Sequence, residues 1–449
     1  MWVCGWVWFL FQRMLSLVRN TVRSGQRGVG RSLFSSTSSD VSFDGPTVSE
    51  ITVQDNGVHV KWDGGEESFF HNRWLLANCP TRLQEGTGQV LPMVFPANAN
   101  VSKAQVKNVD GQDTVEIGWS FENHKSSFQS SFLKLHDYSL ETLKEKAQKF
   151  DPLTTALRAD DPLPRVRYSD VMDSDESVLE WTTAMEETGL CVVDQIPAVP
   201  KIIRQISDRI APPIVTLYGE IFDVRVEQNA INIAYTAAEL EPHMDLAYYE
   251  SPPGIQMLHC VEFCEDIIGG ESTFFDTFVL AEILRSEDPE AFDTLCRVPA
   301  TFQKNHIARE HPAQMLYQRP HFTRNSSGDL TATFWSPPFE GPLNVPAEDV
   351  EPYYRAYDKF NSLFNNPDVR AEWKLQFRLK PGEMIAFNQR RMLHGRNKFS
   401  DKSKGLRHLQ GIYINIDDYL NRHRYLKCRY GLAETGVESV RRCGNASFS

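Results

Sequence analysis

The stretch "YTAAELEPHMDLAYYESPPGIQMLHC", residues 235–260, holds the feature on which the interpretation of the whole chain depends. His243 is followed after one residue by Asp245, and an apolar run typical of a β-strand comes next. A His-x-Asp pair occurs by chance in many chains of this length, and either side chain can simply be solvated. The pair indicates a metal site only if the chain also offers a third ligand, a group that recognises an anionic partner, and a scaffold that joins them.

The third ligand has a candidate in "RRMLHGR", where His394 follows the strand-like stretch "EMIAF". Two ligands close together on one strand and a third on a distant strand are the pattern of a double-stranded β-helix. Two histidines and one carboxylate on one face of Fe(II) leave three positions open for a cosubstrate and O₂. Taken alone, His394 would be better explained as a loop histidine with its hydrogen bonds satisfied.

The candidate for anion recognition is Arg407, in the strand-like stretch "GLRHLQGIY". The guanidinium group is a rigid fork that binds a carboxylate through two hydrogen bonds. A 2-oxoglutarate that chelates iron through its keto-acid end needs such a cation at its other end. The alternative is a solvated surface charge, which weakens because Arg407 lies downstream of His243 and Asp245 in strand context.

Strand patterns also dominate the remainder of the chain. "ITVQDNGVHVKW" alternates apolar and polar residues around Asn56 and Gly57, which predicts a tight hairpin. "TVEIGWSFENHKSSFQSSFL" repeats that scheme, so we expect two related β units within residues 46–145. A helix is expected at 176–187, before the strand "LCVVDQI". Many strands without βαβ alternation favour a β-barrel or jelly roll with added helices.

Composition excludes some classes of function. The net charge of −12 argues against a nucleic-acid-binding protein, which would need a basic face. Eight cysteines spread over 449 residues are too few for a disulfide scaffold and indicate reduced thiols in an intracellular protein. Beyond the N-terminus no apolar stretch approaches the length of a transmembrane helix, so no membrane partner is expected.

The first forty residues have the composition of a mitochondrial transit peptide. They contain no acidic residue before Asp40, they carry several arginines, and they end rich in serine. The alternative is a secretory signal or anchor formed by the apolar run 2–11. That run is too short to span a bilayer, and its positive charges follow it instead of preceding it. We therefore predict a transit peptide at 1–39 and a mitochondrial location.

Several motifs in the same order resemble one family. "NIAYTAAELEPHMDLAYYESPPGIQMLHC", "GGESTFFDTF", "LHGR" and "RHLQGIY" look like the iron- and 2-oxoglutarate-dependent γ-butyrobetaine and trimethyllysine hydroxylases. The resemblance runs from about residue 46 to residue 427. It implies that His243, Asp245 and His394 bind Fe(II) and act in catalysis, and that Arg407 anchors 2-oxoglutarate. It also implies O₂ as a cosubstrate, ascorbate as reductant, and a homodimer, for which the sequence itself offers no argument.

The expected organisation follows from these patterns and the resemblance. After the transit peptide we expect a small β-rich N-terminal domain at 46–145, a linker at 146–170, a double-stranded β-helix dioxygenase domain at 171–427 and a C-terminal tail at 428–449. The fold class is mainly β with added helices.

The expected reaction is hydroxylation of a small molecule, with 2-oxoglutarate converted to succinate and CO₂. Asp245 argues against the halogenating relatives, which lack this carboxylate. Members of the family hold a quaternary ammonium group in an aromatic cage, since ring faces attract cations. The matching positions here are Tyr218, Phe222, Tyr235 and Tyr413, and Asn232 matches a contact to the substrate's carboxylate end. Taken singly, each aromatic residue would be assigned to the core.

Other positions depart from the family pattern. The segments in question are Leu246, the stretch Phe334-Trp335-Ser336 and the stretch Asn388-Gln389-Arg390-Arg391. In the γ-butyrobetaine enzyme the position of Phe222 is a tryptophan and that of Leu246 a tyrosine. We expect these changes to leave the iron chemistry untouched and to affect the choice of substrate.

The N-terminal domain departs too. Relatives bind zinc through a cysteine cluster and a histidine; Cys79 and His124 match two of those ligands, but Thr81 replaces another cysteine. Two ligands of four cannot close a structural zinc site, so no zinc is predicted.

Three functions are left to distinguish. The first is hydroxylation of γ-butyrobetaine, the second is the same chemistry on trimethyllysine or another small substrate, and the third is a catalytically inactive binding protein. The third requires loss of a metal ligand or of the 2-oxoglutarate anchor, and both are retained in this sequence.

Overall fold

A computed structural model of the chain describes residues 45–92, 94–109, 111–147, 152–226, 233–307, 312–325, 328–400 and 407–432. The chain divides into two compact units, Met1–Lys149 with Glu434–Val437 and Phe150–Ala433 with Glu438–Ser449. The predicted transit peptide, most of the predicted tail, and Asn232 lie outside the described residues.

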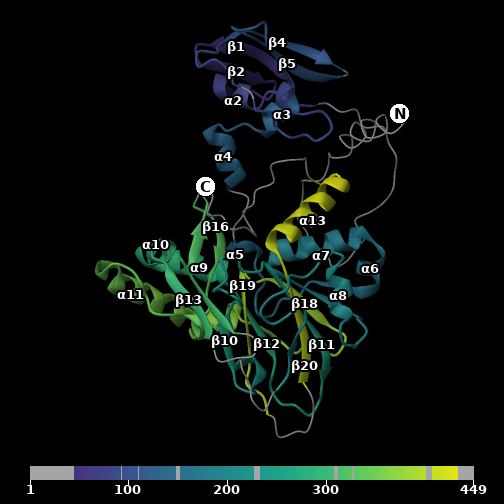
Figure 1. Ribbon diagram of the computed structural model, residues 1–449, viewed down its shortest axis with the longest axis vertical. Helices are drawn as coiled ribbons and strands as arrows, with labels where there is room; N and C mark the ends of the chain where they lie inside the picture. Colours follow the sequence, from purple (N-terminus) through teal and green to yellow (C-terminus); the bar gives the residue numbers. More distant parts are fainter. Residues whose placement is uncertain are drawn as a thin grey trace. The chain divides into compact units, whose positions relative to one another are not determined.

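The first unit consists of short strands and helices (Figure 1). In chain order they are β1 (Val48–Gln54), β2 (Gly57–Trp62), β3 (Glu67–His71), α2 (Asn72–Ala77), η1 (Pro80–Arg82), β4 (Val101–Val109), β5 (Gln112–Trp119), β6 (Lys125–Gln129), α3 (Ser130–Leu135) and α4 (Leu140–Ala147). The predicted hairpin is confirmed, because β1 and β2 pair with Gln54 opposite Gly57. Its two-residue turn is therefore Asp55 and Asn56, one residue earlier than expected.

The two halves of this unit have the same topology. In the described residues, β1-β2-β3 followed by α2 and β4-β5-β6 followed by α3 each form an antiparallel three-stranded sheet that ends in a short helix. The likeness extends to side chains: the indole Nε1 of Trp62 donates to Ser68 Oγ, and that of Trp119 donates to Ser126 Oγ, each at 2.8 Å. The alternating pattern buries the matched valines and tryptophans of both halves in one core. The two related β units expected from the sequence are present.

The second unit holds the remaining elements. These are α5 (Pro152–Thr155), β7 (Arg165–Arg167), α6 (Tyr168–Asp173), α7 (Asp175–Thr188), β8 (Leu190–Asp194), α8 (Ile202–Ser207), β9 (Phe222–Val224), η2 (Ile233–Tyr235), β10 (Leu240–His243), β11 (Ile255–Phe263), β12 (Ser272–Asp276), α9 (Thr277–Glu287), α10 (Pro289–Arg297), β13 (Ala300–His306), β14 (Ala313–Arg319), β15 (Phe322–Arg324), β16 (Leu330–Thr333), η3 (Pro337–Phe339), α11 (Ala347–Leu363), α12 (Pro367–Trp373), β17 (Leu375–Phe377), β18 (Met384–Asn388), β19 (Met392–Arg396), β20 (Arg407–Ile414) and α13 (Ile416–Arg429).

Two sheets of this unit form a sandwich. Within the described residues, one has the strand order β7-β8-β18-β11-β20-β9 and the other has the order β10-β19-β12-β17. Apolar side chains from both sheets pack together between them, among them Val192, Phe274 and Phe387. Because neighbours in a strand point to opposite faces, Cys191 and Val193 lie on the other side of β8, in a separate core with the helices. The jelly-roll fold predicted from the sequence is confirmed.

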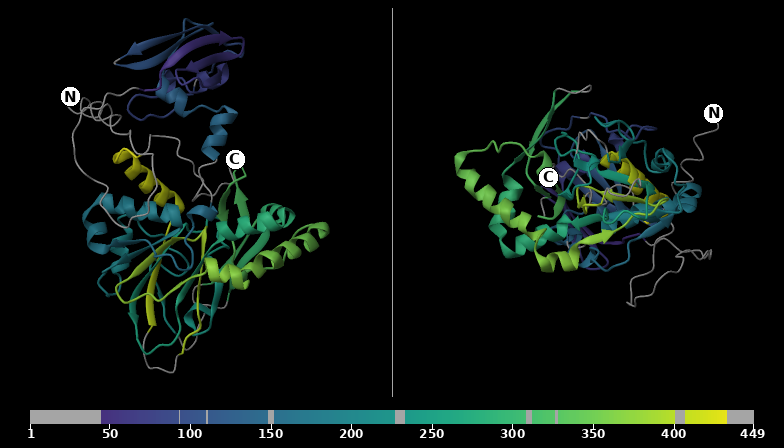
Figure 2. Two further views of the ribbon diagram at one scale, coloured as in Figure 1. Left: turned by 180° about the vertical axis from the view of Figure 1, so that it is seen from behind. Right: turned by 90° about the horizontal axis from the view of Figure 1, so that it is seen from below.

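Helices cover the sandwich on two sides (Figures 1 and 2). The core outside the larger sheet contains residues of α6, α7, α8 and α13, and a second core contains residues of α9, α10, α11 and α12. The helix expected at 176–187 is α7. Ser174 caps its N-terminus by accepting from Ser177 N, and Gly189 ends it in the left-handed conformation, with φ +84°.

The predicted linker is partly structured. Its residues Arg165–Arg167 form β7, which pairs in parallel with β8, and the helix α5 lies just before it in the chain. The sheet of the second unit therefore begins within the segment 146–170.

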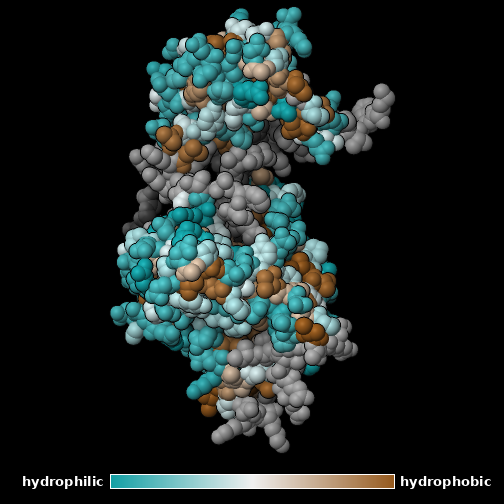
Figure 3. Space-filling view, turned by 60° about the vertical axis from the view of Figure 1, so that its left-hand side comes forward, coloured by the Kyte–Doolittle hydropathy of each residue, from teal (hydrophilic) through white to brown (hydrophobic). Residues whose placement is uncertain are grey.

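On the face shown in Figure 3 hydrophilic side chains predominate, and hydrophobic ones form small separate groups. None of the described helices combines the length and the apolar character needed to cross a membrane.

Candidate metal and cosubstrate site

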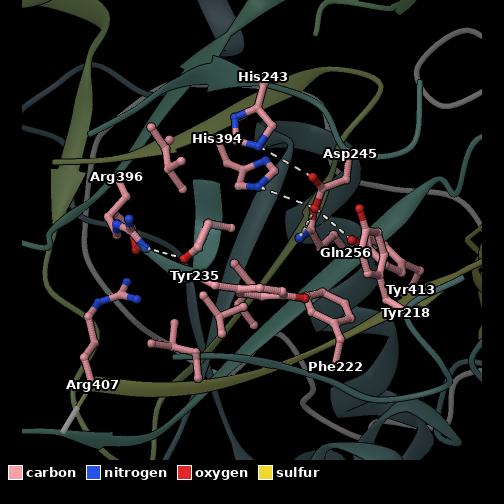
Figure 4. A pocket seen from close by; sticks show the side chains of 17 residues that line it. Tyr218, Phe222, Tyr235, His243, Asp245, Gln256, His394, Arg396, Arg407 and Tyr413 are labelled. Carbon is pink, nitrogen blue, oxygen red and sulfur yellow. Dashed lines mark hydrogen bonds and ion pairs between the residues drawn. The ribbon is translucent and has the colours of Figure 1, made fainter. Parts of the chain in front are cut away.

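The three predicted ligands meet at the smaller sheet. His243 ends β10, His394 lies in β19, and the register of these strands places the two histidines directly opposite each other. Asp245 follows in the loop after β10. The ligand atoms of the three side chains all lie within 4.8 Å of one another, and no other described residues form such a group. Figure 4 shows both imidazoles and the carboxylate converging at one edge of a pocket.

Hydrogen bonding orients the histidine that carries the motif. His243 Nδ1 donates to the Glu241 carbonyl at 2.8 Å, which directs Nε2 toward Asp245, 3.5 Å from Oδ1. His394 Nε2 lies 3.8 Å from Asp245 Oδ2. Two imidazole nitrogens and one carboxylate oxygen at this separation match the donor set of a non-haem Fe(II) site with open positions.

The electrostatics of the three residues are coupled. Burial opposes ionisation of Asp245, but its close contact with His243 and the positive charges that both imidazoles carry at low pH outweigh it and hold the carboxyl pKa below its usual range. Burial also opposes protonation of His243, yet the contact with Asp245 raises the pKa of this imidazole. Burial and the charge on His243 lower the pKa of His394 to about 3. His394 is thus held in the neutral form in which imidazole binds a metal.

Two side chains hold Asp245: Gln256, which the sequence did not indicate, and Tyr413, which was predicted only as a residue of the aromatic cage. Gln256 Nε2 and the Tyr413 hydroxyl both donate to Asp245 Oδ2, at 2.9 and 2.8 Å. The available signal for Gln256 is a polar residue within the apolar strand "GIQMLHC". Its partner across the strands could not be found without the register of β11 and β20.

Arg407, the predicted anion anchor, begins β20 and lines the same pocket. Its guanidinium points into that pocket (Figure 4), and the residue is buried beside the rings of Phe263 and Phe399. No described carboxylate pairs with Arg407, its Nε has no partner, and Nη2 makes one long bond of 3.5 Å to the Gly270 carbonyl. Burial lowers the pKa of Arg407 to about 10, so the group remains charged at neutral pH. A buried cation without a partner requires an anion, which fits the far carboxylate of 2-oxoglutarate.

A second arginine in the pocket wall was not anticipated. Arg396, two residues after His394, donates to the carbonyls of Ala234, Thr236 and Ala238 at 2.7–3.0 Å. These bonds tie the segment that carries Tyr235 to β19. Arg396 therefore holds the pocket wall and is less available than Arg407 to a ligand.

The predicted aromatic residues share one pocket with the ligands. Tyr218, Phe222, Tyr235 and Tyr413 all line it. Phe222 and Tyr413 stack with ring centroids 4.9 Å apart, and Tyr218 lies 6.4 Å from Phe222. Gly411 is opposite Phe222 in the β20–β9 register, and a Cβ at this position would overlap the Phe222 ring. The absence of a side chain at Gly411 thus permits the stack.

The departures from the family pattern lie elsewhere than expected. Leu246, Trp335 and Ser336 are buried and are not among the residues that line the pocket. The Met244 N–H donates to the Trp335 carbonyl, and Ser336 Oγ donates to the Met244 carbonyl, each at 2.8 Å. Gln389 Oε1 accepts from Asp245 N at 3.1 Å. These positions therefore support the loop that holds Asp245, a role that the sequence pattern did not indicate.

That loop contains a strained residue. Leu246 has φ +60°, a backbone conformation that a buried branched side chain rarely adopts. The surrounding contacts hold it there, directly after the ligand.

Cys79 and His124 are neighbours in the first unit. Cys79 Sγ lies 3.6 Å from His124 Nε2, 3.0 Å from Thr81 Oγ1 and 2.9 Å from Ser126 Oγ. Hydroxyl groups thus stand where further zinc ligands would be needed.

Comparison with known proteins agrees with this geometry. Residues 149–413 match the model of the family described as taurine catabolism dioxygenase TauD, TfdA family. Residues 50–134 match the model described as γ-butyrobetaine hydroxylase-like, N-terminal.

Two relatives of known sequence support the same family. A γ-butyrobetaine dioxygenase of Pseudomonas sp. (strain AK-1) is 31% identical over 369 residues, which are 82% of this chain and 93% of that protein. A trimethyllysine dioxygenase of Meyerozyma guilliermondii is 27% identical over 385 residues, 82% of this chain and 92% of that protein. Among solved structures, a putative α-ketoglutarate-dependent taurine dioxygenase from Burkholderia xenovorans aligns with a TM-score of 0.43 at 12% identity, covering 56% of this chain and 89% of that one. The chain belongs to the TauD/TfdA dioxygenase family and is an iron- and 2-oxoglutarate-dependent dioxygenase.

Proposed function

We propose that this enzyme hydroxylates a small quaternary ammonium compound, and that γ-butyrobetaine, which would yield carnitine, is its substrate. The observation that carries the proposal is the aromatic wall of Tyr218, Phe222 and Tyr413 in the same pocket as the two histidines and Asp245. Ring faces attract a trimethylammonium group that has no hydrogen to donate. The pocket thus offers a position for such a cation next to the metal ligands.

The residues of the pocket have separate proposed roles. His243, Asp245 and His394 would hold Fe(II), and Arg407 would bind the far carboxylate of 2-oxoglutarate. Bound iron, with 2-oxoglutarate and O₂, supplies the oxidation that converts a C–H bond to an alcohol while 2-oxoglutarate becomes succinate and CO₂. The protein contributes orientation and a pocket whose apolar residues Val224, Leu258 and Leu409 exclude water.

Trimethyllysine is the second candidate, favoured by the similarity to the Meyerozyma enzyme over most of both chains. Both compounds present a trimethylammonium group to the aromatic wall. They differ at the other end, where γ-butyrobetaine has a carboxylate alone and trimethyllysine has an amino acid group.

The N-terminal composition supports a mitochondrial location for this reaction. The partner we propose is a small molecule; a second copy of the chain is a further expectation from the family resemblance.

The test is succinate formation by the purified chain with Fe(II), ascorbate and 2-oxoglutarate. Parallel reactions contain γ-butyrobetaine, trimethyllysine or no substrate, and mass spectrometry follows a product heavier by one oxygen. Hydroxylation of γ-butyrobetaine well above that of trimethyllysine supports the proposal, and the reverse order selects the second candidate. No succinate and no product under any condition would favour an inactive binding protein.

A further inference from the structure

The carboxylate of Asp245 is held unequally at its two oxygens. Oδ2 accepts both the Gln256 amide and the Tyr413 hydroxyl, at 2.9 and 2.8 Å, whereas Oδ1 lies 3.5 Å from His243 Nε2. The two donors come from adjacent strands, because Gln256 is directly opposite Tyr413 in the β11–β20 register. Cross-strand partners project from the same face of a sheet, so this pair forms one rigid clamp on Oδ2.

Packing restrains the side chains of both donors, Gln256 and Tyr413. Gln256 is 1% exposed and Tyr413 2% exposed. The Tyr413 ring stacks on Phe222 at an interplanar angle of 20°, which sets the position of its hydroxyl. On the other side of the ligand, Gln389 holds the backbone N–H of Asp245.

We propose that Gln256 and Tyr413 are positioning residues for the metal, which occupy Oδ2 so that Asp245 presents Oδ1 alone as ligand. This inference rests on the proposed iron site. It gives Tyr413 two tasks: its ring belongs to the aromatic wall, and its hydroxyl orients a metal ligand. The wall that receives the substrate cation is thereby joined to the metal through one side chain.

The clamp has a chemical reason. Ligand carboxylates are commonly hydrogen-bonded at the oxygen that does not bind the metal, and loss of such a partner weakens metal affinity by about 10- to 100-fold. A carboxylate bound through both oxygens would occupy a position needed by 2-oxoglutarate or O₂. Two donors on Oδ2 oppose that binding mode.

The experiment separates the hydroxyl from the ring. Tyr413→Phe keeps the stack on Phe222 and removes one donor, and Gln256→Met removes the other at similar volume. Tyr419→Phe is the matched control, because the Tyr419 hydroxyl is also buried and donates at 2.9 Å, but to the Thr182 carbonyl in the helical layer. Anaerobic Fe(II) affinity is measured on the full chain by competition with a chelator, and the Fe(II)–2-oxoglutarate absorption band is recorded for each variant.

We expect Fe(II) to bind about 10- to 100-fold more weakly to Tyr413→Phe and to Gln256→Met, and as tightly to Tyr419→Phe as to the unaltered chain. The absorption band should shift in the first two variants only, and the KM for the ammonium substrate should change little in Tyr413→Phe. Unchanged Fe(II) affinity in both variants would overturn the inference and leave the proposed function standing. Failure of the unaltered chain to bind Fe(II) would overturn both.

Discussion

Among the described residues, two clusters contain side chains of the kind that bind metals, one in each unit. His243 Nε2 lies 3.5 Å from Asp245 Oδ1, and Cys79 Sγ lies 3.6 Å from His124 Nε2. The distances are nearly equal, so proximity of two ligand-type atoms does not distinguish them. The first cluster adds the imidazole of His394, whereas the neighbours of Cys79 are the hydroxyls of Thr81 and Ser126.

The difference lies in what completes each cluster. Hydroxyl groups satisfy a thiol by hydrogen bonding but are not the thiolate or imidazole ligands that zinc requires. Ser126 is also engaged by the Trp119 indole, a contact repeated between Trp62 and Ser68 in the other half of the unit. We therefore assign the Cys79 cluster to the packing of the internal repeat and propose the His243 cluster as the iron site.

The largest expected effect comes from removing the carboxylate of the catalytic cluster. Asp245→Ala should abolish 2-oxoglutarate turnover, because it removes a metal ligand. Removing only a hydrogen-bond partner of a ligand lowers metal affinity or activity by about 10- to 100-fold. Succinate formation and bound iron are measured together. Asp266→Ala, at an exposed position, is the control, and turnover retained by Asp245→Ala would show that the ligand assignment is wrong.

The Cys79 cluster can be tested by adding the zinc ligands that it lacks. Thr81→Cys combined with Ser126→Cys would give the Cys79 cluster three sulfurs and one imidazole, a complete tetrahedral set. We expect the double variant to retain about one equivalent of zinc after dialysis and the unaltered chain to retain none, as measured by elemental analysis. His124→Ala in the double variant should release the metal. Stoichiometric zinc in the unaltered chain would contradict the prediction of no zinc site.

The anchor for 2-oxoglutarate should show a smaller, selective effect. Arg407→Ala removes charge-assisted hydrogen bonds of about 1.5–3 kcal/mol, which corresponds to a rise of about 10- to 100-fold in the KM for 2-oxoglutarate. Arg407→Lys should recover part of it, because the charge returns without the fork. Arg324→Ala, which breaks an exposed ion pair with Asp293, serves as control. An unchanged KM for 2-oxoglutarate would place the anchor elsewhere.

The repeat in the first unit yields a prediction about pH. Asp137 follows α3 as Cys79 follows α2, and it accepts from Ser68 as Cys79 contacts Ser126. Burial opposes ionisation of Asp137, but hydrogen bonds from the Ser139 backbone and from neighbouring hydroxyls outweigh it and lower the carboxyl pKa below 3.8. A lowered pKa in the folded state stabilises the fold above pH 3.8, and this contribution is lost as the pH falls through the lowered value.

Asp137→Asn should therefore weaken the first unit by about 1–3 kcal/mol at pH 7, with a smaller difference near pH 3. Hydrogen exchange of the β2 and β5 amides reports this unit separately from the other. Asp63→Asn, at an exposed turn, provides the comparison. Equal protection of the Asp137→Asn chain and the unaltered chain at pH 7 would rule out a stabilising role for the carboxylate.

Features that depend on residues close together in the sequence could be predicted, whereas features that depend on contacts between distant residues could not. The strand alternation, the internal repeat and the His-x-Asp motif are all patterns within a few residues, and they led to the fold and to His243 and Asp245. His394 and Arg407 required only the expectation that distant strands meet. Gln256, Arg396 and Gln389 were missed because their roles arise from cross-strand register and loop contacts, which no local pattern encodes.

The contacts made by the residues that depart from the family pattern were missed for the same reason. Ser336 is 92 residues from Met244 in sequence, yet it donates to the Met244 carbonyl beside the ligand. Matching a sequence to a family motif identifies the residue at a position but not the atoms that this residue contacts.

Ser336→Ala gives the smallest expected effect and tests whether Ser336 supports the loop that holds Asp245. Loss of one buried hydrogen bond should reduce the unfolding free energy by about 1 kcal/mol, and the loop that holds Asp245 should become less well positioned. We expect Fe(II) affinity to fall by a few fold and the KM for the ammonium substrate to stay unchanged, since Ser336 does not line the pocket. Ser362→Ala, which removes an exposed hydroxyl bonded to its own helix, should leave both quantities as they are. A changed substrate KM with unchanged Fe(II) affinity would show that Ser336 acts on the substrate. The expected result would show that a residue that departs from a family motif can affect the metal through the backbone next to a metal ligand.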